Sequence, residues 1–114
     1  MSIVTGNVKF GVNYPVYVTT TPYNFPAYEY NYIISNLSTN STINLPPVSS
    51  VPNGWVFTIK NNGTGTVNLV ANGTDLINSL NSTSNNMNLN PSTIYEFISQ
   101  YTIDGNFWNP ISYL

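Results

Sequence analysis

The segment INLPPVSSVPNGWVFTIKNNGTGTVNLVANG, residues 43–73, decides the fold of this protein. It holds three short apolar runs that are separated by proline or glycine, and Lys60 is its only charged residue. In the second and third runs, apolar and polar side chains alternate with period two, as they do in a half-buried strand. The side chains expected on one side of these strands are Phe57, Ile59, Val67 and Leu69. Such runs between strong turn formers predict short β-strands.

The same alternation continues on both sides of this segment. Residues 28–34 place three tyrosines and Ile34 on one face of a strand, and residues 93–102 alternate in the same way. Asn-Gly and Asp-Gly pairs between the runs supply the positive φ angles of tight turns. These pairs stand at residues 62–63, 72–73 and 104–105. We therefore predict an all-β fold, a small antiparallel β-sandwich or jelly-roll-like module; a trimeric β-prism satisfies the same strand pattern.

A chain of 114 residues is expected to form one domain, residues 1–114, with residues 1–14 as an N-terminal arm or a first strand. No stretch within it has the character of a dividing linker. The start MSIVTGNVKFGV lacks the basic beginning and the apolar run of a secretory signal, and no apolar run approaches membrane-spanning length. We expect a protein that is made without a secretory signal and is not inserted in a membrane.

Charge is scarce in this chain and excludes several kinds of partner. Only 5% of the residues are charged, against roughly 25% in typical domains, and the net charge is −2. Two cations cannot neutralise a phosphate backbone or an anionic lipid surface, so nucleic acid and acidic membranes are excluded as partners. Asn, Ser and Thr supply the polarity instead. A nearly neutral surface can pack against copies of itself without burying ions, so we expect homo-oligomers.

The residues that most enzymes and metal sites need are missing. The sequence has no His and no Cys, which removes the usual base of a Ser–His–acid triad and the usual ligands of zinc. Two carboxylates could still work as a glycosidase pair, but their spacing does not favour it, and we expect structural roles. The four candidates are Glu29, Asp75, Glu96 and Asp104. We predict a protein that is not an enzyme and holds no cofactor or metal.

Aromatic residues are the best candidates for contacts with a ligand or a partner. The chain has two tryptophans, nine tyrosines and five phenylalanines. An exposed ring beside asparagine amides can stack on a sugar whose hydroxyl groups the amides bind, whereas buried tryptophans would simply belong to the core. The segment YPVYVTTTPYNFPAYEYNYI is so rich in tyrosine that some rings must be exposed or lie between subunits. The candidate glycan or interface contacts are Tyr23, Tyr28, Tyr30, Tyr32, Trp55 and Trp108.

Six short motifs occur in a fixed order over residues 19–110. They begin with TTPY and INLP, continue with GWVFTIKNNG and GTVNL, and end with GTDLI and DGNFW. They fall at Thr20–Tyr23, Ile43–Pro46, Gly54–Gly63, Gly65–Leu69, Gly73–Ile77 and Asp104–Trp108. In this ordered run the chain resembles a small β-domain of virus and bacteriophage fibre, tail and head-decoration proteins.

The resemblance implies a structural module of the virion, commonly a homotrimer, that serves in assembly or in contact with a host surface. It implies no catalytic residues, and its expected partners are the chain itself, other virion proteins and a host-surface glycan. The alternative hypothesis from the residues is a carbohydrate-binding module that uses exposed aromatic rings and asparagine side chains. The two hypotheses are compatible, because a fibre protein can bind sugars.

Overall fold

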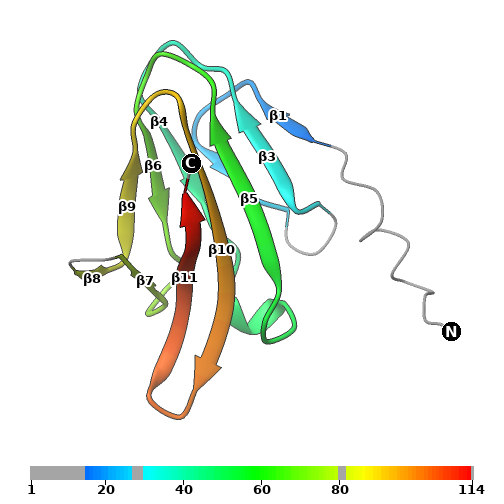
Figure 1. The fold of residues 1–114 in the computed structure, drawn as a ribbon, viewed down its shortest axis with the longest axis vertical. Helices are drawn as coiled ribbons and strands as arrows, with labels where there is room; N and C mark the ends of the chain where they lie inside the picture. The colour runs from blue at the N-terminus through cyan, green and yellow to red at the C-terminus, as the bar shows by residue number, and fades with distance from the viewer. Residues whose placement is uncertain (1–14, 27–29, 80–81, 114) are drawn as a thin grey trace, which may run out of the picture.

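The computed structural model describes residues 15–26, 30–79 and 82–113, and it consists of two β-sheets packed face to face (Figure 1). The seven-stranded sheet has the order β1-β3-β5-β10-β11-β7-β8, and the four-stranded sheet has the order β2-β4-β6-β9. The strands are β1 (Val16–Val18), β2 (Tyr23–Asn24), β3 (Tyr32–Ser35), β4 (Ser41–Asn44), β5 (Val56–Asn61), β6 (Val67–Val70), β7 (Leu76–Asn78), β8 (Thr83–Ser84), β9 (Asn86–Leu89), β10 (Thr93–Thr102) and β11 (Gly105–Tyr113). A short 3-10 turn, η2 (Val48–Ser50), follows β4. The predicted all-β, two-sheet fold is confirmed.

From β1 to β6 the chain winds around the core as a short coil. Successive strands fall alternately in the seven-stranded and the four-stranded sheet, so that β1, β3 and β5 pair in parallel, as do β2, β4 and β6. The last two turns of this coil are in strict register. Ile59 pairs with Ile33 and Leu69 with Ile43, in each case 26 residues further along the chain. Residues 58–70 therefore stack directly on residues 32–44.

The second half of the chain closes the two sheets. Strand β10 runs antiparallel between β5 and β11, and β9 pairs antiparallel with β6. The expected antiparallel arrangement is correct for four of the nine pairings among the described strands, whereas the other five are parallel. The physical reason lies in the turns. A proline or glycine turn can reverse the chain within one sheet, or it can carry the chain across to the opposite sheet, with the same local residues.

The core between the sheets is apolar and rich in aromatic rings. The inward positions predicted for β5 and β6 are confirmed, because Phe57, Ile59, Val67 and Leu69 are all buried. Five rings form a contiguous cluster at the centre, in which Phe57 stacks on Phe97 with ring centroids 5.2 Å apart. The members of the cluster are Phe25, Trp55, Phe57, Phe97 and Trp108. Edge-to-face and stacked contacts of this kind contribute beyond the burial of area alone.

Two glycines allow the turns of the coil to stack at the corner after β5. A Cβ atom on Gly63 would overlap the carbonyl oxygen of Leu37, and one on Gly65 would overlap the carbonyl oxygen of Thr39, both in the preceding turn of the coil. The predicted positive φ is confirmed at Gly73 and Gly105, but Gly63 does not adopt it. The glycine at position 63 serves close approach of two backbones instead.

Candidate binding surface

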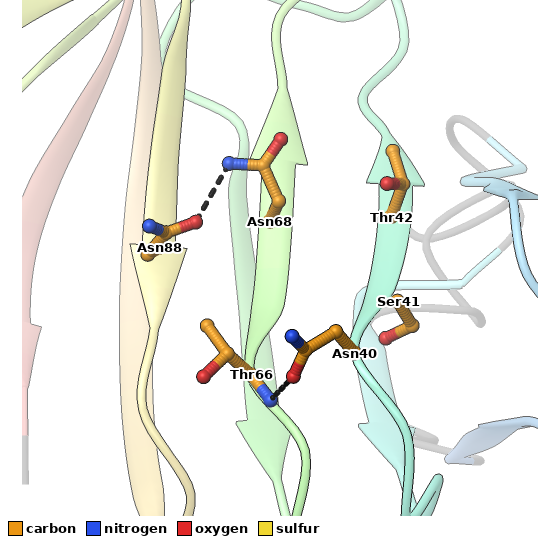
Figure 2. A pocket seen from close by; sticks show the side chains of 6 residues that line it. All are labelled: Asn40, Ser41, Thr42, Thr66, Asn68 and Asn88. Carbon is orange, nitrogen blue, oxygen red and sulfur yellow. Dashed lines mark hydrogen bonds between the residues drawn. The ribbon is translucent and has the colours of Figure 1, made fainter.

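The outer face of the four-stranded sheet carries an open hollow of about 380 Å³ (Figure 2). Its lining is composed entirely of residues with uncharged polar side chains, contributed by β4, β6, β9 and the positions just before β4 and β6. They are Asn40, Ser41, Thr42, Thr66, Asn68 and Asn88. Ser41 borders the hollow, but its hydroxyl oxygen is buried and makes no hydrogen bond within the described residues. The other five residues are partly or fully exposed.

The strand register brings three of these side chains into one row. Thr42 pairs with Asn68, and Asn68 pairs with Asn88, so the row crosses β4, β6 and β9 at right angles to the strands. Each of the three alternates with more buried neighbours along its strand, and therefore points away from the core. Neighbouring strands lie about 4.8 Å apart, which sets the spacing of polar groups along the row.

Two hydrogen bonds hold the amides of the hollow in place. Asn68 Nδ2 donates to Asn88 Oδ1 at 2.8 Å, and the backbone N–H of Thr66 donates to Asn40 Oδ1 at 3.0 Å (Figure 2). Several groups make no hydrogen bond to any residue that the structure describes. These are Asn68 Oδ1, Asn88 Nδ2, Asn40 Nδ2 and the hydroxyl groups of Thr42 and Thr66. The hollow thus presents oriented donors and acceptors without charge, which is the chemistry that recognises hydroxyl groups.

Both tryptophans lie in the core, which corrects their proposed role as contacts. Trp108 is 0% exposed and Trp55 is 7% exposed, with their ring centroids 6.2 Å apart. The alternative interpretation, that they are core residues, is confirmed. Trp108 follows the inward alternation of β11, where it pairs with the buried Ser99. Its indole N–H has no hydrogen-bond partner among the described residues, so the ring contributes through its volume and contacts.

Two of the candidate tyrosines, Tyr23 and Tyr32, lie in different sheets. Tyr23 in β2 packs against the core, whereas Tyr32 in β3 lies on the outer side of the seven-stranded sheet. Tyr30 is 39% exposed, and Tyr28 lies outside the described residues. Burial, and to a lesser extent the nearby Tyr30, raises the pKa of Tyr23. Tyr23 and Tyr32 therefore do not lie on one contact surface.

The carboxylates have separate positions. Glu96 lies on β10, where Thr58 Oγ1 donates to Glu96 Oε2 at 3.4 Å, and Asp104 lies exposed in the turn before β11. Asp75 is buried, and Glu29 lies outside the described residues. Within the described ranges, no three His, Cys, Asp or Glu residues come together as metal ligands. No helix in those ranges is long and apolar enough to cross a membrane.

Asp75 has a structural contact that its sequence context predicts only in part. Its Oδ2 accepts a hydrogen bond of 2.8 Å from the backbone N–H of Val48, which is the first residue of η2 and is fully buried. From the sequence, an aspartate in a turn is expected to accept a hydrogen bond from its own local backbone. In the structure, the Asp75 carboxylate accepts its hydrogen bond from a residue 27 positions earlier in the chain. The carboxylate therefore connects the turn before β7 with η2.

Replacing Asp75 by alanine is expected to destabilise the fold by about 2 kcal/mol, because a buried N–H loses a charged acceptor. Urea unfolding of Asp75→Ala measures this loss. Asp104→Ala is the matched control, since Asp104 is exposed and its loss should change stability by less than about 0.5 kcal/mol. Equal effects of the two substitutions would contradict a structural role for Asp75.

The hollow was not predicted from the sequence. Its residues belong to the Asn, Ser and Thr that fill most polar positions of this chain, so no local motif distinguishes them. They come together only because β4, β6 and β9 pair in one register. A signal existed in the outward alternation around Thr42, Asn68 and Asn88, but it required knowledge of which strands are neighbours.

No family model, curated protein or solved structure matches this chain. Inferences about its role therefore rest on its residues, its fold and the hollow.

Proposed function

We propose that this protein is a non-enzymatic structural component of a virion, of the capsid or fibre type, that contacts neutral glycans of a host surface through the hollow of the four-stranded sheet. The observation that supports the glycan contact is the uncharged lining of the hollow. Its amide and hydroxyl groups include donors and acceptors that make no hydrogen bond to the described residues. The assignment to a virion is supported by the ordered strand and turn motifs over residues 19–110 and by the scarcity of charge.

The chemistry of the hollow suits a neutral sugar better than other ligands. Sugar hydroxyl groups both donate and accept hydrogen bonds, so they can satisfy the free amide nitrogen of Asn88 and the free amide oxygen of Asn68 at once. An anionic ligand would find no cation in the lining, and an apolar ligand would leave these polar groups unpaired. A volume of about 380 Å³ also falls within the range of small-molecule sites, roughly 300–1,000 Å³.

Loss of the free groups in the hollow is expected to weaken glycan binding. A Thr42→Val/Asn88→Ala variant keeps the shape of β4 and removes one hydroxyl and one amide, and we expect at least a tenfold weaker Kd, roughly 1.4 kcal/mol. The experiment screens the unmodified protein on a neutral glycan array and then measures the best binder by calorimetry.

Asn24→Ala is the matched control for the glycan experiment. Asn24 lies on the same sheet and accepts a hydrogen bond of 3.0 Å from Asn44 Nδ2, as Asn88 does from Asn68, but it does not line the hollow. This variant should bind as the unmodified protein does. Equal weakening by both variants, or no binder on the array, would overturn the glycan contact.

Placement in a virion has its own test. Quantitative mass spectrometry of purified particles should find the chain in a fixed ratio to the major capsid protein. Its absence from particles would overturn the assignment to a virion but would leave the glycan hollow to be judged by its own experiment.

A further inference from the structure

Three Asn-Gly pairs occur in this chain, at residues 53–54, 62–63 and 72–73. Besides forming turns, such a pair can react with itself. The backbone nitrogen of the glycine can attack Cγ of the asparagine side chain, because glycine has no Cβ to obstruct the approach and its backbone rotates easily. All three pairs consist of the same two residues, so a large difference in reactivity between them must come from the fold.

Both reacting groups of the pair at 53–54 are held by hydrogen bonds. Asn53 Oδ1 accepts a hydrogen bond of 3.2 Å from the backbone N–H of Tyr101. The Gly54 N–H donates one of 2.9 Å to the carbonyl oxygen of Ser99. Both partners belong to β10, so the turn is fixed to that strand. The Gly54 nitrogen can reach Asn53 Cγ only after these hydrogen bonds break.

The pair at 62–63 is held in the same way at the corner after β5. Asn62 Nδ2 donates to Asn36 Oδ1 at 3.1 Å. The Gly63 N–H donates to Oδ1 of the buried Asn61, also at 3.1 Å. Backbone atoms of Leu37 occupy the position that a Cβ of Gly63 would take, so this corner has little room to bend. The Gly63 nitrogen is therefore kept away from Asn62 Cγ.

The pair at 72–73 differs from the other two, because neither of its reacting groups is held. Asn72 and Gly73 are exposed, and the Asn72 side chain and the Gly73 N–H make no hydrogen bond to any residue that the structure describes. No atom stands within 4 Å of a Cβ built on Gly73. The turn contains a hydrogen bond of 2.8 Å from the Asp75 N–H to the Asn72 carbonyl oxygen. That bond involves neither the Gly73 nitrogen nor Asn72 Cγ.

We propose that Asn72 is a site of spontaneous deamidation, which reacts in the folded protein while Asn53 and Asn62 are protected. The Gly73 nitrogen forms a bond to Asn72 Cγ, the bond between Cγ and Nδ2 breaks, and Nδ2 leaves as ammonia with the proton that solvent removes from the Gly73 N–H. The product is a five-membered succinimide ring. Water then adds to one of the two ring carbonyl carbons and breaks its bond to nitrogen, which gives aspartate or isoaspartate. Water is the only co-reactant.

Deamidation at this turn has a structural consequence. Asn72 and Asp75 are the two ends of the turn, and Asp75 is the buried carboxylate that accepts the hydrogen bond from Val48. Isoaspartate adds a methylene group to the main chain at position 72, which displaces the turn that positions Asp75. Either product also adds one negative charge to a chain with a net charge of −2. This inference is independent of the proposed virion role and of the glycan contact.

Incubation of the folded full-length protein in a mildly alkaline buffer tests the proposal. Anion exchange separates the more acidic form, and peptide mapping by mass spectrometry gives the rate of deamidation at each pair. We expect Asn72 to react at least about tenfold faster than Asn53 or Asn62, because hydrogen bonds must break before those two can react. In urea-unfolded protein the three rates should become similar. Comparable rates in the folded protein, or an equal preference for Asn72 in urea, would overturn the proposal.

Two matched variants locate the reaction independently of the mapping. Asn72→Gln should lose most of the acidic form, because the longer side chain must close a larger ring, whereas Asn62→Gln should form it as fast as the unmodified protein does. Persistence of the acidic form in Asn72→Gln at the original rate would refute the assignment. Circular dichroism verifies that both variants are folded. The isolated isoaspartate form should unfold at a lower urea concentration than the unmodified protein, and an unchanged midpoint would overturn the effect on Asp75.

Discussion

Replacing Gly65 by alanine is expected to destabilise the fold by about 3 kcal/mol or more, a large part of the total stability of a small domain. The added Cβ would overlap the carbonyl group of Thr39, which belongs to the backbone of the preceding turn of the coil. That turn cannot yield easily, because Ser41 pairs with Val67 immediately beyond the corner, and the Ser41 N–H donates to the carbonyl oxygen of Thr66 at 3.0 Å. Relief of the overlap therefore requires the strands to separate.

Urea unfolding of Gly65→Ala beside Gly73→Ala measures the effect with a matched control. Gly73 also lies in a turn and has φ +56°, but no atom stands within 4 Å of a Cβ built there. Its replacement should cost only about 1–2 kcal/mol of backbone strain. If Gly65→Ala were no more destabilising than Gly73→Ala, that result would contradict the close contact between Gly65 and the backbone of Thr39.

Replacing Asn61 by alanine is the second substitution with a large expected effect. Asn61 is 1% exposed, and its side chain makes three hydrogen bonds at the corner after β5. Nδ2 donates to the carbonyl oxygens of Gly65 at 2.9 Å and Leu89 at 3.0 Å, and Oδ1 accepts from the N–H of Gly63 at 3.1 Å. The amide thus holds the corner closed and ties it to the end of β9. Alanine would leave buried backbone groups unpaired, at about 1–3 kcal/mol for each.

Thermal unfolding of Asn61→Ala should show a loss of about 3 kcal/mol in total, since the exposed part of the corner can recruit water. Asn62→Ala is the matched control, because Asn62 is the next residue, is exposed, and its side chain donates to Asn36 Oδ1 at 3.1 Å. It should change stability by no more than about 0.5 kcal/mol. Similar melting temperatures for the two variants would contradict the role of Asn61 as the connection at this corner.

Asn61 also shows what can and cannot be predicted from the alternation of residues along one strand. Period-two alternation correctly places its neighbours Phe57 and Ile59 in the core, and by the same rule it places Asn61 inward. From the sequence alone, however, a buried asparagine would be an exception to the burial of apolar side chains. Its three hydrogen-bond partners, Gly63, Gly65 and Leu89, come together only when the chain is folded. The structure is therefore needed to see that the buried Asn61 amide has hydrogen-bond partners for both its nitrogen and its oxygen.

The aromatic residues show the same division. The sequence identified the tryptophans as either contacts or core, and their buried positions in the structure select the core. The tyrosine-rich segment could not be assigned to one surface, because Tyr23 joins the four-stranded sheet and Tyr32 the seven-stranded sheet. Local alternation carries no information on which sheet a strand joins, and here the turns carry the chain across from one sheet to the other.

The amino-acid sequence by itself determined the all-β class, the places of most turns and the absence of His and Cys, the usual base of a serine triad and the usual ligands of zinc. These properties depend on residue type and on spacing of a few residues, which alternation and turn preference report directly. Only the tertiary structure decided the parallel coil, the 26-residue register and the hollow. The reason is physical: pairing between Thr42, Asn68 and Asn88 is chosen by the packing of distant strands, and the same polar residues would fit other registers equally well.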